Sequence, residues 1–370
     1  MRTHPIAIVG AGIIGLLTAR ELALAGHEVA LFEQGVLGCE ASWAAGGILS
    51  PLHPWRYPDA VTRLAHLSQA AYPALCQGLA ETTGIDPEWT ESGLLRVGDD
   101  ESLEAHRWAA RFGVALEVRD GGELLPAGGS QEPCLWMPTV AQVRSPRLLK
   151  ALGAELSALG VSLHEQATVE GFQWQRDKFK GLVVNGEEVA AEQAVVAGGA
   201  WSGALLARYG LPLPVNPVRG QMIAIQARPD TLTIMTLKNA RYLVPRRDGA
   251  ILVGSTIESV GFNKATTEAA REDLLQAAID LLPGLEAFPV THHWAGLRPS
   301  CPEGIPFIGE HPEIRGLFVN TGHFRNGIVL APASAALTAD LILGRDPRLD
   351  PSSYALDRIS RSRTTEPMVG

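Results

Sequence analysis

The sequence predicts an α/β protein in which a parallel, doubly wound domain is interleaved with a second, mainly antiparallel α+β domain. Three observations support this prediction. A buried strand, a glycine-rich turn and an apolar helix follow one another near the N-terminus, and this order returns twice later in the chain. Before the last return, residues 215–297 are rich in short strands and contain a single helical segment. The chain of 370 residues is long enough for two domains.

The N-terminal stretch of residues 5–33 is typical of a βαβ unit that binds a dinucleotide, and its glycines have G-x-G-x-x-G spacing. Gly10 suits the tight turn, Gly12 lets the backbone approach a pyrophosphate, and Gly15 lets helix and strand pack closely. Glu33 ends the second strand, where it is placed to hydrogen-bond a ribose hydroxyl and to disfavour a 2′-phosphate. The motif therefore predicts a Rossmann-like fold that binds FAD or NAD, without separating the two.

Further along the chain, apolar periodicity and turn residues predict the elements in order. A stripe of apolar residues predicts a helix over 59–83. Ser145 followed by Pro146 suggests an N-cap and a first helical residue, and so a helix to about Leu159. We expect a hairpin or a three-stranded meander near 169–184. The remaining expected strands are 94–97, 114–118, 135–137, 161–163, 193–199, 218–226, 241–245, 251–254 and 316–320, and the remaining helices lie near 101–112, after 267 and over 328–343.

Strands followed by glycine turns and helices place ligand-binding backbone at the carboxyl edge of a sheet. Because this pattern recurs near the C-terminus, we expect the last helix to point its N-terminus at the same ligand. The expected domains are therefore discontinuous. They are residues 1–88, 138–213 and 299–370 for the FAD-binding domain, and residues 89–137 and 214–298 for the substrate-binding domain.

Composition narrows the function. A net charge of −9 argues against nucleic acid or an anionic membrane as the main partner. Four cysteines are widely separated and form no C-x-x-C pair, which is typical of reduced thiols. No uncharged apolar run reaches eighteen residues and no signal peptide is visible, so we expect a cytoplasmic protein without a membrane span. His292 and His293 are neighbours on an expected strand and face opposite sides, so no metal site is predicted.

Two arginines lie in apolar, glycine-rich surroundings, Arg298 in WAGLRP and Arg325 in GHFRNG. Arginine is rarely buried without an anionic partner. The two therefore indicate an anionic small substrate, such as a carboxylate held bidentately, although a structural salt bridge is the alternative for each. Tyr242, in ARYLVP, either adds a hydroxyl to this anion-binding site or is a core aromatic residue. The small-residue loop that contains Ser42, Ala45, Gly46 and Gly47 suggests a backbone passing close to a flat group, or else a flexible loop.

The chain resembles the D-amino-acid oxidase family of flavoproteins over nearly its full length. The resemblance rests on IAIVGAGIIG with LFE, SWAAGGILSP, VVAGGAWS, RYLVPRRDG, LVGST, WAGLRP and GHFRNGIVLAPAS, which occur in the family's order. It implies a two-domain fold with non-covalent FAD. It also implies oxidation of glycine or another small amine or D-amino acid, such as sarcosine or D-alanine, with oxygen reduced to hydrogen peroxide.

Carried over by position, the resemblance implies that Arg298 grips the substrate carboxylate, that Tyr242 hydrogen-bonds it, and that Arg325 lies near flavin and pocket. Ser50, Ala240 and Ile257 would also line the pocket. Ala240 and Ile257 stand where close relatives have histidine and methionine, which puts the preferred amine in doubt. The FAD-contacting set would be Gly10, Gly12, Ile13, Ile14, Gly15, Glu33, Gln34, Ser42, Ala45, Gly46, Gly47, Ile48, Val169, Gly198, Arg298, Asn326, Gly327 and Ile328.

The mechanism implied by the resemblance is hydride transfer from the α-carbon of a neutral amine to flavin N5. Such a reaction needs orientation rather than a general base. The imine then hydrolyses to an α-keto acid and ammonia, or is passed to thiazole biosynthesis for thiamine. Cys301 lies in PSCPEGIP, a context unlike that of relatives with covalent flavin.

Three alternatives are retained: a D-amino-acid dehydrogenase that passes electrons to a quinone, a sarcosine oxidase-like demethylase, and an FAD-binding scaffold without activity. Relatives are often tetramers, so a homotetramer is an open expectation.

Overall fold

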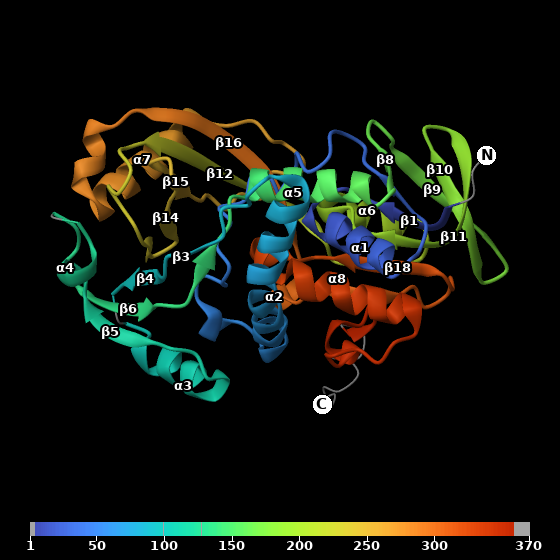
Figure 1. The fold of residues 1–370 in the computed structure, drawn as a ribbon, viewed down its shortest axis with the longest axis horizontal. Helices are drawn as coiled ribbons and strands as arrows, with labels where there is room; N and C mark the ends of the chain where they lie inside the picture. Colours follow the sequence, from blue (N-terminus) through green and yellow to red (C-terminus); the bar gives the residue numbers. More distant parts are fainter. Residues whose placement is uncertain (1–3, 99, 127, 359–370) are drawn as a thin grey trace, which may run out of the picture.

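The computed structural model describes residues 4–98, 100–126 and 128–358. Figure 1 shows two lobes side by side, one around each of two sheets; helix α2 (Asp59–Thr83) lies between them, and α5 (Ser145–Ala158) extends over the lobe that contains the first sheet. Within the described residues each of the two sheets has eight strands. The predicted fold class, an α/β protein with a Rossmann-like part and a mainly antiparallel part, is confirmed.

The first sheet has a parallel centre, with β11, β1, β2 and β8 as successive neighbours. β18 extends the parallel part beside β11, and β17 pairs with β18 in antiparallel fashion. β9, β10 and β11 form an antiparallel meander. The bounds are β1 His4–Val9, β2 Val29–Phe32, β8 Ser162–His164, β9 Val169–Gln175, β10 Lys178–Val184, β11 Glu187–Val196, β17 Phe307–Glu310 and β18 Leu317–Thr321.

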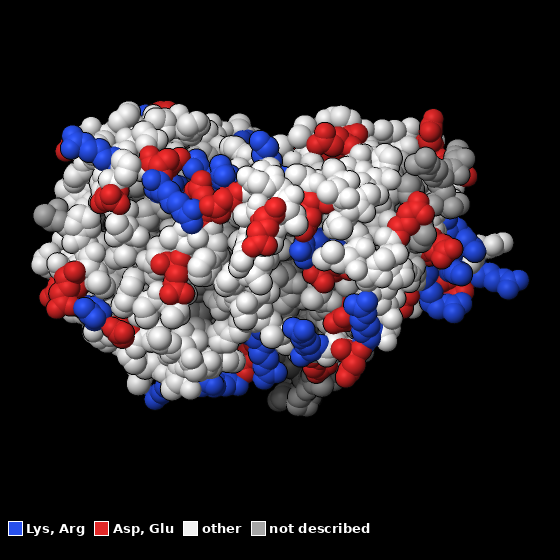
Figure 2. All heavy atoms as spheres, viewed as in Figure 1, with Lys and Arg blue, Asp and Glu red and all other residues white. Residues whose placement is uncertain are grey.

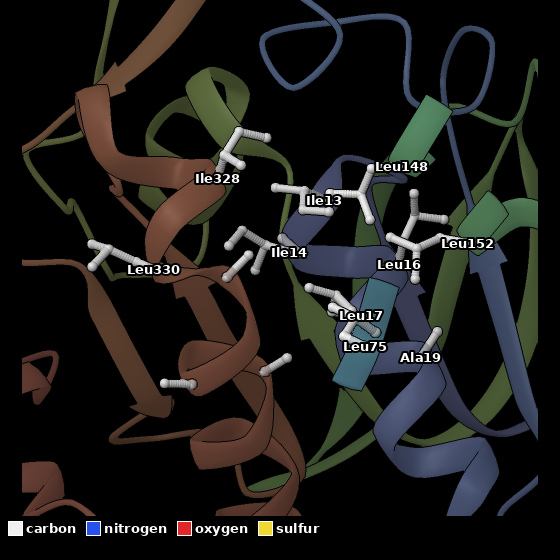
Figure 3. Packing of buried hydrophobic residues seen from close by; sticks show 14 of the residues in the cluster. Ile13, Ile14, Leu16, Leu17, Ala19, Leu75, Leu148, Leu152, Ile328 and Leu330 are labelled. Carbon is white, nitrogen blue, oxygen red and sulfur yellow. The ribbon is translucent and has the colours of Figure 1, made fainter. Parts of the chain in front are cut away.

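Four helices form one apolar core against this sheet: α1 (Ile13–Leu24), α2, α5 and α8 (Gly327–Leu343). α1 is buried along most of its length, and its apolar residues are spread around the helix rather than confined to one face. Figure 3 shows its side chains between those of α5 and α8, with Leu75 of α2 close by. The residues labelled there are Ile13, Ile14, Leu16, Leu17 and Ala19 of α1, Leu148 and Leu152 of α5, and Ile328 and Leu330 of α8.

One segment of the described chain, Phe324–Leu343, is long and apolar enough to cross a membrane by length and composition. About half of it is buried, and it includes α8, which packs against α1 and α2. The hydrophobicity of this segment is therefore accounted for by packing in the core of the first lobe.

The second sheet is antiparallel except where β13 runs parallel to β4. Its order is β16-β12-β15-β14-β13-β4-β6-β5, and β12 and β16 are its longest strands. The bounds are β4 Leu94–Val97, β5 Glu117–Asp120, β6 Pro133–Met137, β12 Asn216–Gln226, β13 Met235–Lys238, β14 Arg241–Pro245, β15 Ala250–Gly254 and β16 Val290–Ser300. β3 (Thr90–Glu91) and β7 (Ala141–Gln142) form a separate two-stranded ladder.

Shorter helices and turns complete the described chain. The α-helices are α3 Ser102–Phe112, α4 Gly121–Leu124, α6 Ser202–Ala207 and α7 Glu268–Leu281. The 3₁₀ turns are η1 Pro54–Arg56, η2 Gly199–Trp201, η3 Pro283–Ala287, η4 Pro302–Gly304, η5 Phe324–Asn326 and η6 Pro351–Tyr354.

Two local predictions are corrected. Ser145 is the first residue of α5 rather than its N-cap, which is Arg144, because the Ser145 hydroxyl donates to the Ala45 carbonyl instead. β5 begins at Glu117, after a turn, rather than at Val114.

We propose that the two sheets mark two domains with the boundaries expected from the sequence. Strands of the first sheet come from residues 4–32, 162–196 and 307–321, and strands of the second come from residues 94–137 and 216–300. β16 continues to Ser300, so it crosses the expected boundary by two residues.

Candidate active site

A cavity of about 460 Å³ is bounded by residues of both sheets. This volume is in the range of small-molecule sites. One end is lined by the turn after β1 and by residues 167–170, and the other is lined by β12, β14 and β16. Of the residues singled out from the sequence, the cavity is lined by Gly10, Gly12, Ile13, Ile14, Glu33, Gln34, Ser42, Ala45, Gly46, Val169, Gly198, Tyr242, Arg298, Arg325, Gly327 and Ile328.

A second cavity of about 50 Å³ shares part of this wall. Tyr242, Arg298 and Arg325 line both cavities. Gly47, Ile48, Ser50 and Asn326 line only the smaller one. The three side chains that the sequence associates with substrate binding are therefore brought together where the two cavities share a wall.

Two expected pocket residues lie elsewhere. Ala240 is exposed in the turn between β13 and β14, because β14 begins only at Arg241 and residue 240 does not share the inward face of Tyr242. Ile257 is 50% exposed in the segment after β15. Neither residue lines either cavity. The expectation that these two positions face a bound substrate stays a prediction.

The glycines of the first turn let it pack closely against the neighbouring backbone. Gly10 has φ of +103°, and a Cβ there would lie 2.6 Å from the Ala197 carbonyl oxygen. Gly15 does not line the cavity; a Cβ there would lie 1.9 Å from the Gly10 carbonyl oxygen, so it packs helix against turn. Ser42 Oγ accepts a hydrogen bond from the Ile13 N–H at 3.0 Å. The small-residue loop thus fixes the beginning of α1.

The Glu33 carboxylate is buried at the end of β2 and accepts two backbone hydrogen bonds. Oε2 accepts from the Ala11 N–H at 2.8 Å and Oε1 from the Gly35 N–H at 2.9 Å. An ionised carboxylate offers about four acceptor positions, so two remain for ribose hydroxyls. The residues at this end therefore fit the adenosine half of a dinucleotide.

Arg298 presents a guanidinium without a carboxylate partner. Nη1 donates to the Thr256 carbonyl at 3.0 Å and Nη2 to Ser255 Oγ at 2.7 Å. Within the described residues no acidic oxygen lies within 4.0 Å of Arg298 or of Arg325. Burial lowers the pKa of Arg298 from its ordinary value, Tyr242 offsets part of this effect, and the Arg325 cation adds to it. Two adjacent cations without an acid favour an anionic ligand.

Tyr242 lies beside Arg298 with its hydroxyl weakly engaged. The phenol is 7% exposed and, among the described residues, its hydroxyl donates only to Met222 Sδ at 3.6 Å, a weak acceptor. A Cβ on Gly254, opposite in β15, would lie 2.5 Å from the Tyr242 oxygen, and one on Gly46 would lie 3.2 Å from the ring. These glycines let the ring lie flat at the cavity wall with its hydroxyl available to a ligand.

Sequence reasoning missed the residues that place these side chains. A Cβ on Gly220 of β12 would lie 2.1 Å from both terminal nitrogens of Arg298, so the guanidinium lies across this glycine. An isolated glycine inside an apolar strand, as in VRGQMIAIQ, is a signal of close approach. Ser255 and Thr256 carry no comparable signal, since their role depends on how β15 ends.

Other candidate chemistry is not supported at this site. His323 lines the larger cavity but is buried, and burial lowers its pKa to about 3, so its imidazole is neutral. Burial raises the pKa of the Cys301 thiol to about 12, and Cys301 lines neither cavity. In the part of the chain that the structure describes, no three His, Cys, Asp or Glu side chains are grouped to hold a metal ion.

Comparison with known proteins identifies the family. The model of the DAO family, described as FAD dependent oxidoreductase, matches residues 5–341. The chain is 49% identical over 355 residues to a glycine oxidase of Pseudomonas aeruginosa, covering 95% of this chain and 98% of that protein. A crystal structure of glycine oxidase from Geobacillus kaustophilus has a TM-score of 0.91 and 33% identity, covering 97% of this chain and 99% of that one.

A further relative has a second part. The chain is 34% identical over 385 residues to the bifunctional protein ThiO/ThiG of Trichormus variabilis. This match covers 99% of the chain and 57% of the longer relative.

Proposed function

The chain belongs to the DAO family of FAD-dependent oxidoreductases, and on that premise we propose that it oxidises glycine and other small amino acids at the amino-bearing carbon. The observation that carries this proposal is the position of the Arg298 guanidinium beside the Tyr242 hydroxyl. This guanidinium has no acidic partner among the described residues. A substrate carboxylate is the planar anion that these two groups suit.

The elongated cavity fits FAD in the orientation that the family implies. Gly10, Gly12 and the N-terminus of α1 would hold the pyrophosphate, and Glu33 the ribose. The flavin would then lie toward Tyr242 and Arg298, between residues 45–48 and the start of α8. Because Cys301 lines neither cavity, we expect this FAD to be non-covalent.

Bound FAD supplies the two-electron acceptor, taking a hydride from the substrate α-carbon. The protein supplies orientation: Arg298 and Tyr242 hold the carboxylate so that the α-C–H faces the flavin. The amine must be neutral when the hydride leaves, and solvent takes its ammonium proton. The imine product hydrolyses to an α-keto acid and ammonia, while two electrons and two protons convert oxygen to hydrogen peroxide.

The small cavity favours a small substrate. A space of about 50 Å³ lies beside Arg298 and Tyr242, and a flavin ring against residues 46–48 would narrow it further. Glycine and sarcosine, or D-alanine with one methyl group, suit such a space better than a long side chain.

The place of this reaction in the cell is also proposed. A relative of this chain is named ThiO/ThiG, which supports passing the imine to thiazole biosynthesis for thiamine. We expect a soluble cytoplasmic enzyme, with oxygen as acceptor and a homotetramer as its assembly. Figure 2 shows lysines and arginines interspersed with acidic residues on the visible face, without the basic stripe that nucleic acid requires.

An anaerobic screen tests the proposed reaction. Glycine, sarcosine and D-alanine are mixed with the holoenzyme, and loss of the flavin absorbance is recorded; a primary amine without a carboxylate serves as the control. We expect the amino acids to bleach the flavin and the simple amine to do so poorly. Failure of every amino acid would contradict the proposal and support an inactive scaffold.

Product analysis separates the remaining alternatives. Glyoxylate and methylamine from sarcosine indicate oxidation at the carboxymethyl carbon, whereas formaldehyde and glycine indicate demethylation. Turnover with oxygen alone, compared with turnover on an added quinone, separates an oxidase from a dehydrogenase.

A further inference from the structure

Three consecutive carbonyl groups beside the cavity all point away from it. The carbonyls of residues 45, 46 and 47 accept, in that order, from Ser145 Oγ at 3.1 Å, from Arg246 Nη2 at 2.8 Å and from the Val143 N–H at 2.9 Å. Ser145, Arg246 and Val143 are buried and line neither cavity. The donors therefore hold these carbonyls from the side opposite the cavity.

The N–H groups of the same peptides consequently face the cavity. In a trans peptide the N–H of the following residue is antiparallel to the carbonyl. Ile48 and Gln142 form an antiparallel bridge flanked by the hydrogen bonds from Val143 to Gly47 and from Leu49 to Ala141, so the N–H of Ile48 points away from that ladder. Gly46, Gly47 and Ile48 all line the smaller cavity, and Gly46 lines the larger one as well.

These three N–H groups have no acceptor among the residues that the structure describes. Backbone donors at a buried position are nearly always paired. A row of three donors on the cavity wall is suited to the electron-rich edge of a planar ligand such as a flavin ring.

We call the three donors Val143, Ser145 and Arg246 the carbonyl-holding group. Arg246 is its only charged member. Its guanidinium also donates to Gln142 Oε1 at 2.7 Å and to the Val143 carbonyl at 3.0 Å. None of its three acceptors is a carboxylate, and no acidic oxygen of the described chain lies within 4.0 Å of it. Burial lowers the pKa of Arg246 to about 10, with Arg144 adding to the effect, so the group keeps its charge at neutral pH.

We propose that Arg246 is a positioning residue for FAD: it turns the row of N–H groups at residues 46–48 toward the flavin, and its buried charge favours the reduced flavin. The proposal rests on FAD binding and not on the identity of the substrate. A guanidinium that holds the Gly46 carbonyl also polarises that peptide, which strengthens its N–H as a donor. Positive charge near the flavin edge raises the potential at which the flavin is reduced.

The test compares variants of the holoenzyme by two measurements that need no substrate. Arg246→Met removes the charge and the hydrogen bonds. We expect the Kd of FAD, measured by quenching of flavin fluorescence, to rise about tenfold or more, as for a lost charged hydrogen bond. We expect the midpoint potential of the bound flavin to become more negative. Arg246→Lys should retain most of the parent potential, because it keeps the charge.

Arg247→Met is the matched control. Arg247 is adjacent in sequence but partly exposed, and it is bonded to Asp86 and to the Trp89 carbonyl. This variant should keep the parent Kd and potential. A folded Arg246→Met protein with parent Kd and potential would overturn the proposal, as would an Arg247→Met protein that shows the same changes.

Gln142→Glu tests the charge if Arg246→Met does not fold. It places a carboxylate against the guanidinium while retaining a hydrogen-bond acceptor of the same shape. We expect a more negative midpoint potential with an FAD affinity closer to that of the parent than in Arg246→Met. A potential equal to the parent value in folded Gln142→Glu would overturn the role of the charge.

Discussion

At the scale of single residues, glycines determine where Arg298 and Tyr242, the two side chains proposed to bind the substrate, lie. The Arg298 guanidinium lies across Gly220, and the Tyr242 hydroxyl lies against Gly254. A methyl group at either glycine would occupy the position of an atom of its neighbour. The chemistry of the site thus depends on residues that have no functional group.

Gly220→Ala tests this dependence. The new Cβ would displace the Arg298 guanidinium, so we expect kcat/KM for glycine to fall about 100-fold through loss of the bidentate carboxylate contact. Gly284→Ala is the control, because a Cβ there would meet no atom within 4 Å. Steady-state kinetics on both variants, with FAD content measured, would show the contrast. Equal kcat/KM in the two variants would remove Gly220 from the site.

His323 makes stability depend on pH. Its pKa is about 3 in the folded protein against an ordinary value of 6.5, so between these values the unfolded chain binds a proton that the folded chain does not. The stabilisation is therefore complete above pH 6.5 and is lost as pH falls toward 3, by about 1.4 kcal/mol per pH unit. His53, whose pKa burial lowers to about 4, acts in the same direction.

Urea unfolding at pH 6.5 and at pH 5 measures this loss. We expect His323→Gln to reduce the loss by about 2 kcal/mol relative to the parent. His27→Gln, at an exposed position, is the control and should keep the parent loss. An identical loss in His323→Gln and the parent would contradict the assignment.

At the scale of elements, the unit of β1, its turn and α1 was predictable because its signals are local. The buried strand, the glycine spacing and the acid at the end of β2 all lie within residues 5–33. The carbonyl-holding group of Arg246 was not predictable from such signals. It joins residues 45–47 to residues 143, 145 and 246, and only the packing of α5 and β14 beside the loop brings them together.

Gly15→Ala tests the packing of this unit. A Cβ at position 15 would lie 1.9 Å from the Gly10 carbonyl oxygen, so α1 must move from the turn that would hold the pyrophosphate. We expect the Kd of FAD to rise at least tenfold and the free energy of unfolding to fall by about 1–3 kcal/mol, as in overpacking.

Gly78→Ala within α2 is the matched control. A Cβ there would meet no atom within 4 Å, so FAD affinity should be unchanged and stability should rise by about 0.5–1 kcal/mol. Flavin fluorescence titration and urea unfolding measure both effects. Parent-like FAD affinity in Gly15→Ala would contradict the role assigned to this glycine.

At the scale of the whole molecule, the cavity joins two sheets that are discontinuous in sequence. The fold class, α/β with an interleaved antiparallel domain, was predicted from strand–turn–helix units that alternate along the chain with strand-rich segments. The apolar, glycine-rich surroundings of Arg298 indicated an anionic ligand, but its pairing with Tyr242 on one carboxylate came from the family resemblance, because the N-terminal glycine turn and these residues are more than two hundred positions apart. Ala240 and Ile257 line neither cavity, so their place in the substrate pocket still rests on the resemblance alone.

Because FAD would contact both sheets, its removal should destabilise the whole molecule. At a free FAD concentration of 100 times Kd, binding adds about 2.7 kcal/mol to the free energy of unfolding. We expect the apoprotein to melt at a lower temperature than the holoenzyme. ADP, which reaches only the end near Glu33, should restore part of the difference. Equal melting temperatures for apoprotein and holoenzyme would contradict a cavity that FAD fills.

The central claim, that Arg298 holds a substrate carboxylate against the flavin, is tested most directly by the anaerobic rate of flavin reduction by glycine in the parent, Arg298→Met and Arg315→Met. Arg315 is an exposed arginine paired with Asp177 and serves as the control. We expect the second-order rate constant to fall at least 100-fold in Arg298→Met alone, with little change for a primary amine that lacks a carboxylate. A parent-like rate constant for glycine in Arg298→Met would contradict the account.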